Sequence, residues 1–499
     1  MTGHSEIVPE RVDAPIRATL ATESARIFLD CADAVYTRGE FLRAAEAGAA
    51  ALQAQGIKLG DRVLLTSGAD SVFWVNLAAA WFAGAVPVPV AQQMTDVHAE
   101  SIVTKAGPSL IMRTDERHPD AFKTLPVFQK IADAVFSVPA ITPQDQAAVL
   151  FTSGSTGQPK GVKLSGRSLT GNSRGILSVL DLRDGDRLFI SIPSHFTSAI
   201  NHFIACGLTG ATLVSREQKL MKADLHKFIL NHDITCFGGA PMQLRWLAEC
   251  AEITPMPRLR WVMSSGDALP VEVIRALHTF QPNTAIFTVY GLTELGGRFC
   301  ILPSDALPAH AGAVGRPMLG LTATIRDEAG AALEDGEEGE IYADWAFLFD
   351  GYINDPEASQ HALTPFGMRT GDIGYVDKAG YLRLVGRADD IFKVSGQKVS
   401  ASEIGRVAMM TGLFEDVAAM PMPHPVAGSA PVLFYTMKDG QAFDKGAVVR
   451  AIRAALPANH VPQAFVPTQT IPRTGSGKLQ RGQLRQLVAA LASGKESAA

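Results

Sequence analysis

Between residues 61 and 291 the sequence alternates between short strand-like segments and longer helix-like segments, and this alternation restricts the fold more than any other feature. The segments that favour strands are 62–68, 187–193, 234–239, 260–266 and 285–291. Those that favour helices are 71–85, 201–210, 223–233, 240–250 and 270–280. Strands that take turns with helices form α/β sheets with helices packed on their faces. The first part of the chain is therefore predicted to be an α/β domain.

The character of the sequence changes after Gly312, where short strands separated by Gly, Asp and Asn turns predict a small barrel-like β region. The last hundred or so residues favour a small α+β domain with helices at 400–410, 446–456 and 482–492. A chain of 499 residues is too long for one core. We therefore predict an α/β protein with a large N-terminal domain (1–387) of stacked sheets, helices and a β-barrel-like subdomain. A smaller, mobile α+β domain (388–499) follows.

Composition excludes several classes of protein. A net charge of −5 provides no general attraction for nucleic acid. The five cysteines are scattered and form no CxxC pair, so neither a disulfide framework nor a zinc site is indicated. The N-terminus lacks the order of a signal peptide, and the apolar stretch 75–91 is interrupted by Pro87 and Pro89. We expect a cytoplasmic protein without a membrane span; a homodimer remains open.

The segment LFTSGSTGQPKGVKLS at 150–165 is the most informative motif. It carries alternating hydroxyls and glycines, namely Thr152, Ser153, Gly154, Ser155, Thr156 and Gly157. Glycines let backbone N–H groups converge on an anion, hydroxyls add donors, and Lys160 adds a compact positive charge. This is not a Walker loop, because Gln158 and Pro159 separate Gly157 from Lys160 and both flanks favour strands. The competing interpretation is an ordinary Gly/Ser hairpin; the two hydroxyl–glycine repeats followed by Pro-Lys-Gly favour a phosphate site.

This motif resembles the phosphate-binding signature of the adenylate-forming superfamily, which comprises acyl-CoA synthetases, luciferases and nonribosomal adenylation domains. The resemblance extends from about residue 40 to about residue 485, with the other signatures in the family's order. It is strongest for the acyl- or aryl-CoA ligase branch. It implies an α/β adenylation domain followed by a C-terminal domain that rotates between two half-reactions.

The YGLTE motif at 290–294 combines an aromatic ring, a hydroxyl and a carboxylate within five residues. Such a set can stack a base, contact a phosphate oxygen and hold a hard cation. The resemblance implies these roles for Tyr290 (adenine), Thr293 (α-phosphate) and Glu294 (Mg²⁺), with Gly291 in the turn. A looser match, SSGDALP at 264–270, places Gly266, Asp267 and Ala268 near the purine.

The remaining signatures lie towards the C-terminus. A carboxylate can accept hydrogen bonds from two neighbouring hydroxyls, and the resemblance assigns the ribose to Asp372, with Arg387 beside the ribose or phosphate. A simple Asx turn is also compatible with Asp372. Asp389 corresponds to the family's hinge, and the segment from Lys393 to Lys398, with Gly396, would enter the site for thioester formation.

PRTGSGKLQR at 472–481 lacks the first glycine and the final Ser or Thr of a Walker loop. The resemblance makes Lys478 the lysine that reaches the carboxylate and the α-phosphate.

The residues expected around the acid pocket depart from the family's usual pattern. In IPSHFTSAINH (192–202), His195 lies one place early relative to the family's usual histidine, which leaves Phe196 at that position. His195 could line the pocket or cap the following helix. Gly239, Ser265 and Gly297 are further pocket candidates, whereas Arg298 could approach the pocket or form a surface salt bridge. Trp345 stands where the family usually has glycine, without a functional explanation.

These features predict an ATP-dependent carboxylic acid ligase that forms an acyl-adenylate and pyrophosphate and then acylates the thiol of CoA. ATP, Mg²⁺ and CoA are the expected cofactors. The alternative is a stand-alone adenylation enzyme that loads a separate carrier protein through its phosphopantetheine. A nucleotide-binding protein without ligase turnover is the third possibility; it would require damage to Lys478, Glu294 or the phosphate loop, and none is damaged.

Overall fold

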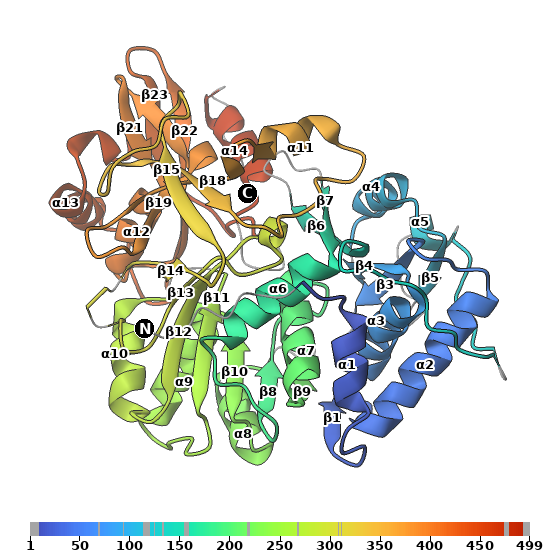
Figure 1. Cartoon of the computed structure of the whole chain (residues 1–499). Coiled ribbons are helices and arrows are strands. Elements are labelled where there is room, and N and C mark those ends of the chain that lie inside the picture. Colours follow the sequence, from blue (N-terminus) through green and yellow to red (C-terminus); the bar gives the residue numbers. More distant parts are fainter. Residues whose placement is uncertain are drawn as a thin grey trace.

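The computed structural model describes residues 9–67, 70–92, 94–112, 120–123, 125–131, 134–153, 159–216, 220–266, 269–307, 309–310, 312–473 and 479–492. It has a large N-terminal part with two main sheets, a β-rich region above them and a smaller C-terminal part (Figure 1). The prediction of a mixed α/β chain with a large N-terminal and a smaller C-terminal domain is confirmed.

The largest sheet has nine strands in the order β14-β13-β12-β11-β10-β8-β9-β1-β2. From β12 to β1 the neighbouring strands are parallel, so their carboxyl ends lie along the same edge. The strands are β1 (Ile27–Asp30), β2 (Val35–Thr37), β8 (Arg187–Ile190), β9 (Thr212–Ser215), β10 (Cys236–Gly239), β11 (Trp261–Ser265), β12 (Ala285–Tyr290), β13 (Cys300–Leu302) and β14 (Arg316–Pro317).

Helices cover both faces of this sheet. Along β11, Val262 faces one apolar core, whereas Trp261 and Met263 face another, because side chains alternate between the faces of a strand. The first core is completed by α8 (Lys222–Asn231), α9 (Pro241–Ala251) and α10 (Val271–Phe280), and the second by α6 (Gly166–Leu177) and α7 (Thr197–Thr209). A parallel sheet buried on both faces is the arrangement that the strand–helix alternation predicts.

A smaller parallel sheet lies beside the first, in the order β4-β3-β5 (Figure 1). Its strands are β3 (Arg62–Ser67), β4 (Val86–Ala91) and β5 (Leu110–Met112), and its helices include α2 (Arg38–Ala54), α3 (Ser71–Ala83) and α4 (Asp96–Ala106); α1 (Asp13–Leu20) packs against α7 of the large sheet. Trp74 of α3 stacks on Phe203 of α7 with ring centroids 5.2 Å apart, which joins the two sheets. The apolar stretch 75–91 is divided between α3 and β4. Among the helices of the described ranges, none combines the length and hydropathy needed to cross a bilayer.

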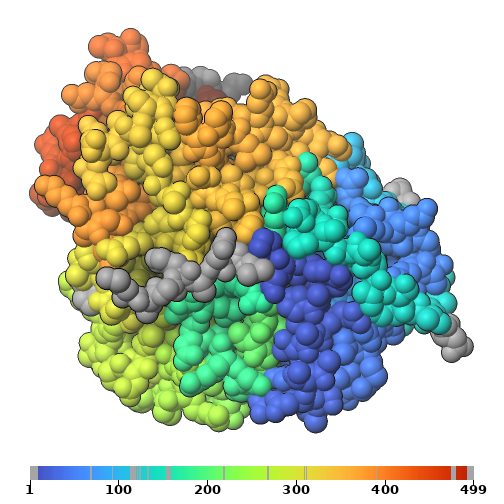
Figure 2. Space-filling model, in the orientation of Figure 1, coloured from blue at the N-terminus to red at the C-terminus, as the bar shows by residue number. Residues whose placement is uncertain are grey.

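A β-hairpin connects this region with the β-rich region. It consists of β6 (Gln146–Ser153) and β7 (Pro159–Ser165), paired antiparallel, and it reaches the surface between the blue and the orange parts of the molecule in Figure 2. Thr152 and Lys160, two of the residues expected to bind phosphate, therefore lie opposite each other where the two strands meet the connecting segment. The flanking strands predicted on either side of the Gly/Ser segment are present.

The barrel-like region expected after Gly312 is a five-stranded antiparallel sheet. It contains β15 (Thr322–Arg326), β16 (Gly339–Asp344), β17 (Leu363–Thr364), β18 (Gly367–Val376) and β19 (Leu382–Arg387), with α11 (Pro356–Ala362). Trp345 and Phe347 anchor this sheet to α6: an added Cβ at Gly171 would lie 3.1 Å from the Trp345 ring and 2.8 Å from that of Phe347. Trp345 is 5% exposed, so its presence has a packing explanation.

The C-terminal part has its own two small apolar cores. It comprises the hairpin β20 (Ile391–Val394) and β21 (Gln397–Ser400), the sheet β22 (Phe414–His424), β23 (Gly428–Met437) and β24 (Ala464–Pro467), and the helices α12 (Ala401–Met410), α13 (Lys445–Ala455) and α14 (Arg481–Ala492). The three helices lie where the sequence predicted them. The boundary between 387 and 388 remains a prediction; β19 ends at Arg387.

Candidate active site

The YGLTE motif follows β12 at the shared carboxyl edge of the large sheet. Tyr290 is the last residue of β12, and Thr293 and Glu294 lie in a short 3₁₀ turn, Thr293–Leu295. Gly291 is required by packing, because an added Cβ would overlap the carbonyl oxygen of Gly297. Gly297 itself has a φ of +134° and its missing side chain leaves room for Asn201 of α7. The glycines therefore fold the motif into a compact loop against α7.

Tyr290, Asp372 and Arg387 form one connected group although 82 residues separate the first two. The Tyr290 hydroxyl donates a hydrogen bond to Oδ2 of Asp372, and Nη1 of Arg387 lies 3.2 Å from Oδ1. Asp372 and Arg387 are directly opposite in the β18–β19 ladder. Burial, reinforced by the negative charge of Asp372, raises the pKa of Tyr290 well above its ordinary value, so the phenol remains a donor. Three residues that the sequence assigns to the nucleoside thus lie together.

Glu294 and Lys160 both contact Tyr352. The Tyr352 hydroxyl donates to Oε1 of Glu294 at 2.9 Å, and Nζ of Lys160 lies 5.2 Å from the Tyr352 ring centroid. Lys160 is paired with Thr152 across the β6–β7 hairpin. Burial and the charge of Glu294 raise the pKa of Tyr352, which keeps its proton available for this bond. A carboxylate, an ammonium group and the end of the phosphate hairpin are therefore gathered at one place.

Tyr352 was not identified from the sequence. The segment 350–353 runs beside β7, where Ile353 N donates to Gly161 O at 2.8 Å and Lys163 N to Gly351 O at 3.1 Å. This backbone pairing brings the ring to Glu294. The only local signal was an aromatic residue after Gly351 in a turn-rich stretch, which indicates nothing about Glu294, 58 residues away.

Thr293 contacts the beginning of α7. The Thr197 hydroxyl, in the first turn of α7, donates to Oγ1 of Thr293 at 3.0 Å.

Residues 154–158, Asp267, Ala268 and Lys478 lie outside the described residues, as do the side chains of Ser153 and Asp389. The roles predicted for Gly154, Ser155, Thr156, Gly157, Asp267, Ala268, Lys478 and Asp389 therefore stay predictions.

The His195 side chain contacts the smaller sheet. Its Nδ1 lies 2.8 Å from Oγ of Ser67, the last residue of β3. The helix α7 begins after Phe196, whose ring centroid is 4.4 Å from that of His195, so His195 does not cap it. Burial lowers the pKa of His195 to about 4, and the imidazole is neutral at physiological pH.

The other pocket candidates occupy strand ends on the same edge. Gly239 ends β10 and Ser265 ends β11, and Gly266 follows with a φ of +99°. An added Cβ at Gly239 would lie 2.6 Å from the Phe237 ring, so glycine is needed there for packing. Arg298 is 3% exposed, which excludes the surface salt bridge considered from the sequence.

The hinge candidates lie where the β-rich region joins the C-terminal part. Asp389 belongs to the short turn Ala388–Asp390, and Lys393 and Lys398 are paired across the β20–β21 hairpin. Gly396, with a φ of +82°, forms the hairpin turn. Asp390 forms a two-contact ion pair with Arg481, the first residue of α14. The C-terminal helix is thereby attached directly to the hinge.

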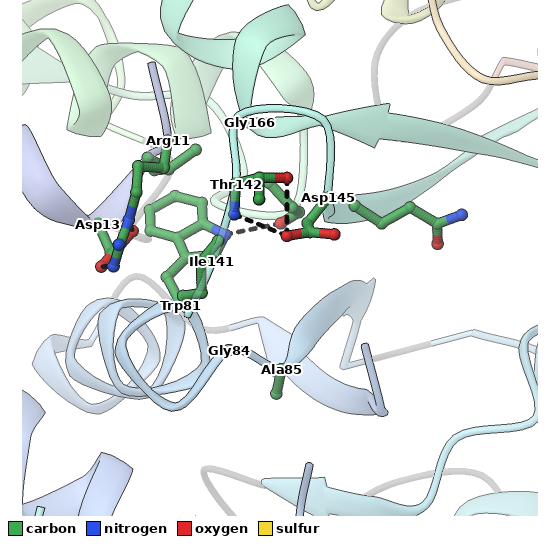
Figure 3. Close-up of a pocket in the computed structure, with 12 residues that line it drawn as sticks. Arg11, Asp13, Trp81, Gly84, Ala85, Ile141, Thr142, Asp145 and Gly166 are labelled. Atoms are coloured by element: carbon green, nitrogen blue, oxygen red, sulfur yellow. Dashed lines mark hydrogen bonds and ion pairs between the residues drawn. The ribbon is translucent and has the colours of Figure 1, made fainter. Parts of the chain in front are cut away.

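Arg11, Trp81 and Thr142 are among the residues that line a separate small cavity (Figure 3). Its volume is about 20 Å³, room for about one water molecule. Two of its polar groups are paired within the chain: Trp81 Nε1 donates to Ala147 O at 2.6 Å, and Thr142 N donates to Asp145 Oδ2 at 2.7 Å. This cavity is a packing gap and offers no substrate site.

The fold and the arrangement of these groups define a nucleotide-dependent α/β enzyme. The chain belongs to the AMP-binding enzyme family: the family's main domain matches residues 16–353, more than half of the chain, and its C-terminal domain matches 406–478. A long-chain-fatty-acid–CoA ligase of Mycobacterium tuberculosis is 27% identical over 457 residues, covering 87% of this chain and 90% of the relative. A 4-coumarate–CoA ligase of Humulus lupulus is 26% identical over 478 residues, covering 88% and 86%.

The fold is similar to that of the O-succinylbenzoate coenzyme A synthetase of Bacillus subtilis in complex with AMP, with a TM-score of 0.87 at 20% identity, covering 94% of this chain and 98% of the other. The predicted class is therefore confirmed. The protein is an AMP-forming acid–thiol ligase, which joins a carboxylic acid to a thiol through an acyl-adenylate.

Proposed function

We propose that the thiol acceptor is CoA and that the residues gathered at the carboxyl edge of the large sheet carry out adenylation with ATP and Mg²⁺. The observation that carries this proposal is the placement of Glu294, Tyr352 and Lys160 beside the phosphate hairpin. The names of the relatives support CoA as the acceptor, since those described above are CoA ligases.

The nucleoside end of ATP binds Tyr290, Asp372 and Arg387. The Asp372 carboxylate accepts hydrogen bonds from the two ribose hydroxyls. Tyr290 and Arg387 hold that carboxylate in one orientation, because each contacts a different oxygen of it. The Tyr290 ring lies at the end of β12, next to Gly266 of the neighbouring strand end, where it can stack on adenine.

The phosphate end binds the loop between Thr152 and Lys160, together with Thr293. The Glu294 carboxylate fits Mg²⁺, which prefers hard oxygen ligands. In the described part of the chain, no group of three or more His, Cys, Asp or Glu side chains could hold a metal ion. This suits Mg²⁺, which proteins often bind through one or two carboxylates and the phosphates of the substrate. When bound, the ion neutralises charge on the phosphates.

The acid carboxylate attacks the α-phosphorus, a P–O bond forms to the acid oxygen, and the bond to pyrophosphate breaks. The obstacle is the approach of two anions while charge develops on the phosphates. Donors fixed in advance lower this barrier: backbone N–H groups of the hairpin, Lys160 and Lys478. In the second step the thiol attacks the acyl carbon, its proton is released, and AMP leaves. The C-terminal domain turns at Asp389 between the two steps, which withdraws Lys478.

The test is pyrophosphate release by the full-length protein over a panel of aryl, short-chain, long-chain, dicarboxylic and amino acids, each with and without CoA. We expect one turnover per active site without CoA and continuous release with it. Continuous release that requires a phosphopantetheinyl carrier protein, with CoA inactive, would favour the carrier-loading alternative. ATP binding without pyrophosphate release from any acid would contradict the proposal.

A further inference from the structure

Arg298 is a buried cation whose position is fixed by its backbone. Its N–H donates to Asn172 Oδ1 at 3.0 Å, and its carbonyl oxygen accepts from Asn172 Nδ2 at 2.6 Å. The residue is 3% exposed and lies between Gly297 and the strand β13. These bonds hold the Arg298 backbone in the loop that follows Glu294, and the side chain is buried there.

No acidic side chain of the described ranges forms an ion pair with this guanidinium. Its Nη1 is buried and makes no hydrogen bond with any described residue. Its Nη2 lies 3.4 and 3.5 Å from the two ring nitrogens of His202. Burial and the charge of Arg298 lower the pKa of His202 to about 3, so the imidazole is neutral and provides no counter-charge.

A buried charge without a partner is strongly unfavourable. Burial lowers the pKa of Arg298 to about 9, and the group is still cationic at neutral pH. Nδ1 of His202 lies 2.5 Å from Ser198 O and donates to it, which leaves Nε2 as a neutral acceptor. An anion from outside the chain would supply the counter-charge that the described residues do not provide.

The position of His202 separates this cation from the reacting phosphate. Thr197, whose hydroxyl contacts Thr293, begins α7, and His202 lies five residues further, about 7.5 Å along the helix. His202 also contacts the end of β10, because an added Cβ at Gly238 would lie 2.8 Å from its Nε2. Arg298 therefore lies on the α7 face of the sheet, displaced from the carboxylate that is activated.

We propose that Arg298 binds a second anionic group of the acid substrate, a carboxylate or a sulfonate at the end of the molecule opposite the carboxylate that is adenylated. This inference rests on the proposed function. A guanidinium can donate two parallel hydrogen bonds to either group. The substrate class is thus a short acid with two anionic ends, oriented so that only the end near Thr293 meets ATP.

The first test compares matched acids in the pyrophosphate assay with ATP, Mg²⁺ and CoA. The acids are straight-chain dicarboxylates of about four to seven carbons, their monomethyl esters, and an acid of similar length with a terminal sulfonate. We expect the best dianionic acid to exceed its ester in kcat/KM by roughly 30-fold or more, the loss typical of removing one partner of a buried charge pair. The sulfonate distinguishes a requirement for charge from one for a carboxylate.

Equal kcat/KM for diacids and their esters, or activity confined to uncharged-tail acids, would overturn the inference while leaving the ligase function intact. Absence of pyrophosphate release with every acid of the wider panel would instead contradict the proposed function itself. The two failures are therefore distinguishable.

The second test uses Arg298→Met, Arg298→Lys and, as a matched control, the exposed Arg275→Met on α10. We expect Arg298→Met to abolish the preference for the dianion by lowering its kcat/KM roughly 30-fold or more, with the ester unaffected. Arg298→Lys should retain part of the preference, and Arg275→Met all of it. Arg298→Met should also raise the melting temperature, because an unpaired buried charge is removed. A lower melting temperature with an unchanged preference would assign Arg298 a purely structural role.

Discussion

At the scale of single residues, the site depends on side chains that hold other side chains in place. Tyr352 contacts Glu294, Tyr290 contacts Asp372, and Ser67 contacts His195. Each hydroxyl fixes one orientation of a group assigned to the nucleotide or the acid. Such contacts add little charge of their own, so their loss should change binding constants while the fold is kept.

Tyr352→Phe removes the donor to Glu294 and keeps the ring beside Lys160. We expect the Mg²⁺ concentration for half-maximal pyrophosphate release to rise about 10-fold, because partners that orient a metal-binding carboxylate typically affect affinity by this much. The measurement is a Mg²⁺ titration at saturating ATP. The control is Tyr381→Phe, a tyrosine stacked on His310 outside the site. An unchanged titration for Tyr352→Phe would separate Glu294 from metal binding.

His195 predicts a pH dependence of stability. Its pKa falls from 6.5 to about 4 on burial, so the unfolded chain binds the proton more tightly than the folded one. Stability is therefore unaffected above pH 6.5 and decreases as the pH falls from 6.5 towards 4, by about 2 kcal/mol at pH 5. We expect His195→Gln to reduce the difference in melting temperature between pH 7.5 and pH 5. The same difference in both proteins would show that His195 titrates normally.

At the scale of elements, the loop predicted to carry the catalytic lysine is held at both ends by ion pairs. Arg473, before the loop, contacts Asp416 of β22 at 2.6 Å, and Arg481, after it, pairs with Asp390 at the hinge. The first pair is partly exposed, with side-chain exposures of 34% and 27%, whereas Asp390 is 7% exposed. Exposed pairs contribute little, but breaking a buried one leaves a charge without a partner.

Arg481→Met should therefore destabilise the protein by roughly 3 kcal/mol and lower the rate of adenylation, because both the hinge and the start of α14 lose their attachment. Arg473→Met is the matched control, with an expected effect below about 1 kcal/mol. Thermal unfolding and pyrophosphate exchange measure the two quantities. Equal effects of the two substitutions would contradict a special role for the buried pair.

At the scale of the whole molecule, the proposed function requires two half-reactions to share one site, with the C-terminal domain determining which of them proceeds. The AMP-binding C-terminal domain matches 406–478, and it is connected to the large domain through the turn Ala388–Asp390. We expect a change at the hinge and a change at the lysine to affect different steps.

Lys478→Ala should lower the rate of adenylation by roughly 10²–10³, the typical loss of one well-placed donor, with the fold kept. Asp389→Pro should leave adenylation intact and cripple thioester formation, because proline fixes φ where rotation is needed. Single-turnover assays of acyl-adenylate formation and of its reaction with CoA separate the steps. Adenylation by Lys478→Ala within about twofold of the parent would refute the lysine's role. Equal losses in both steps for Asp389→Pro would refute the hinge.

The sequence by itself determined the features that depend on neighbouring residues. Strand–helix alternation, the hairpin around Thr152 and Lys160, and the glycine-rich loop after Tyr290 were all predictable, because apolar period and glycine positions restrict the backbone locally. The family motifs predicted which residues face the nucleotide, and of these Tyr290, Asp372 and Arg387 lie together. These predictions include the positions of β10, β11 and β12 and of the three C-terminal helices.

Only the tertiary structure decided which side chains meet. Tyr352 reaches Glu294 through the pairing of residues 350–353 with β7, and Ser67 reaches His195 from the other sheet. The sequence left Arg298 open between the acid pocket and a surface salt bridge, and the structure buries it where Asn172 of α6 binds its backbone. Burial and partners depend on contacts between distant segments, and no local pattern encodes them.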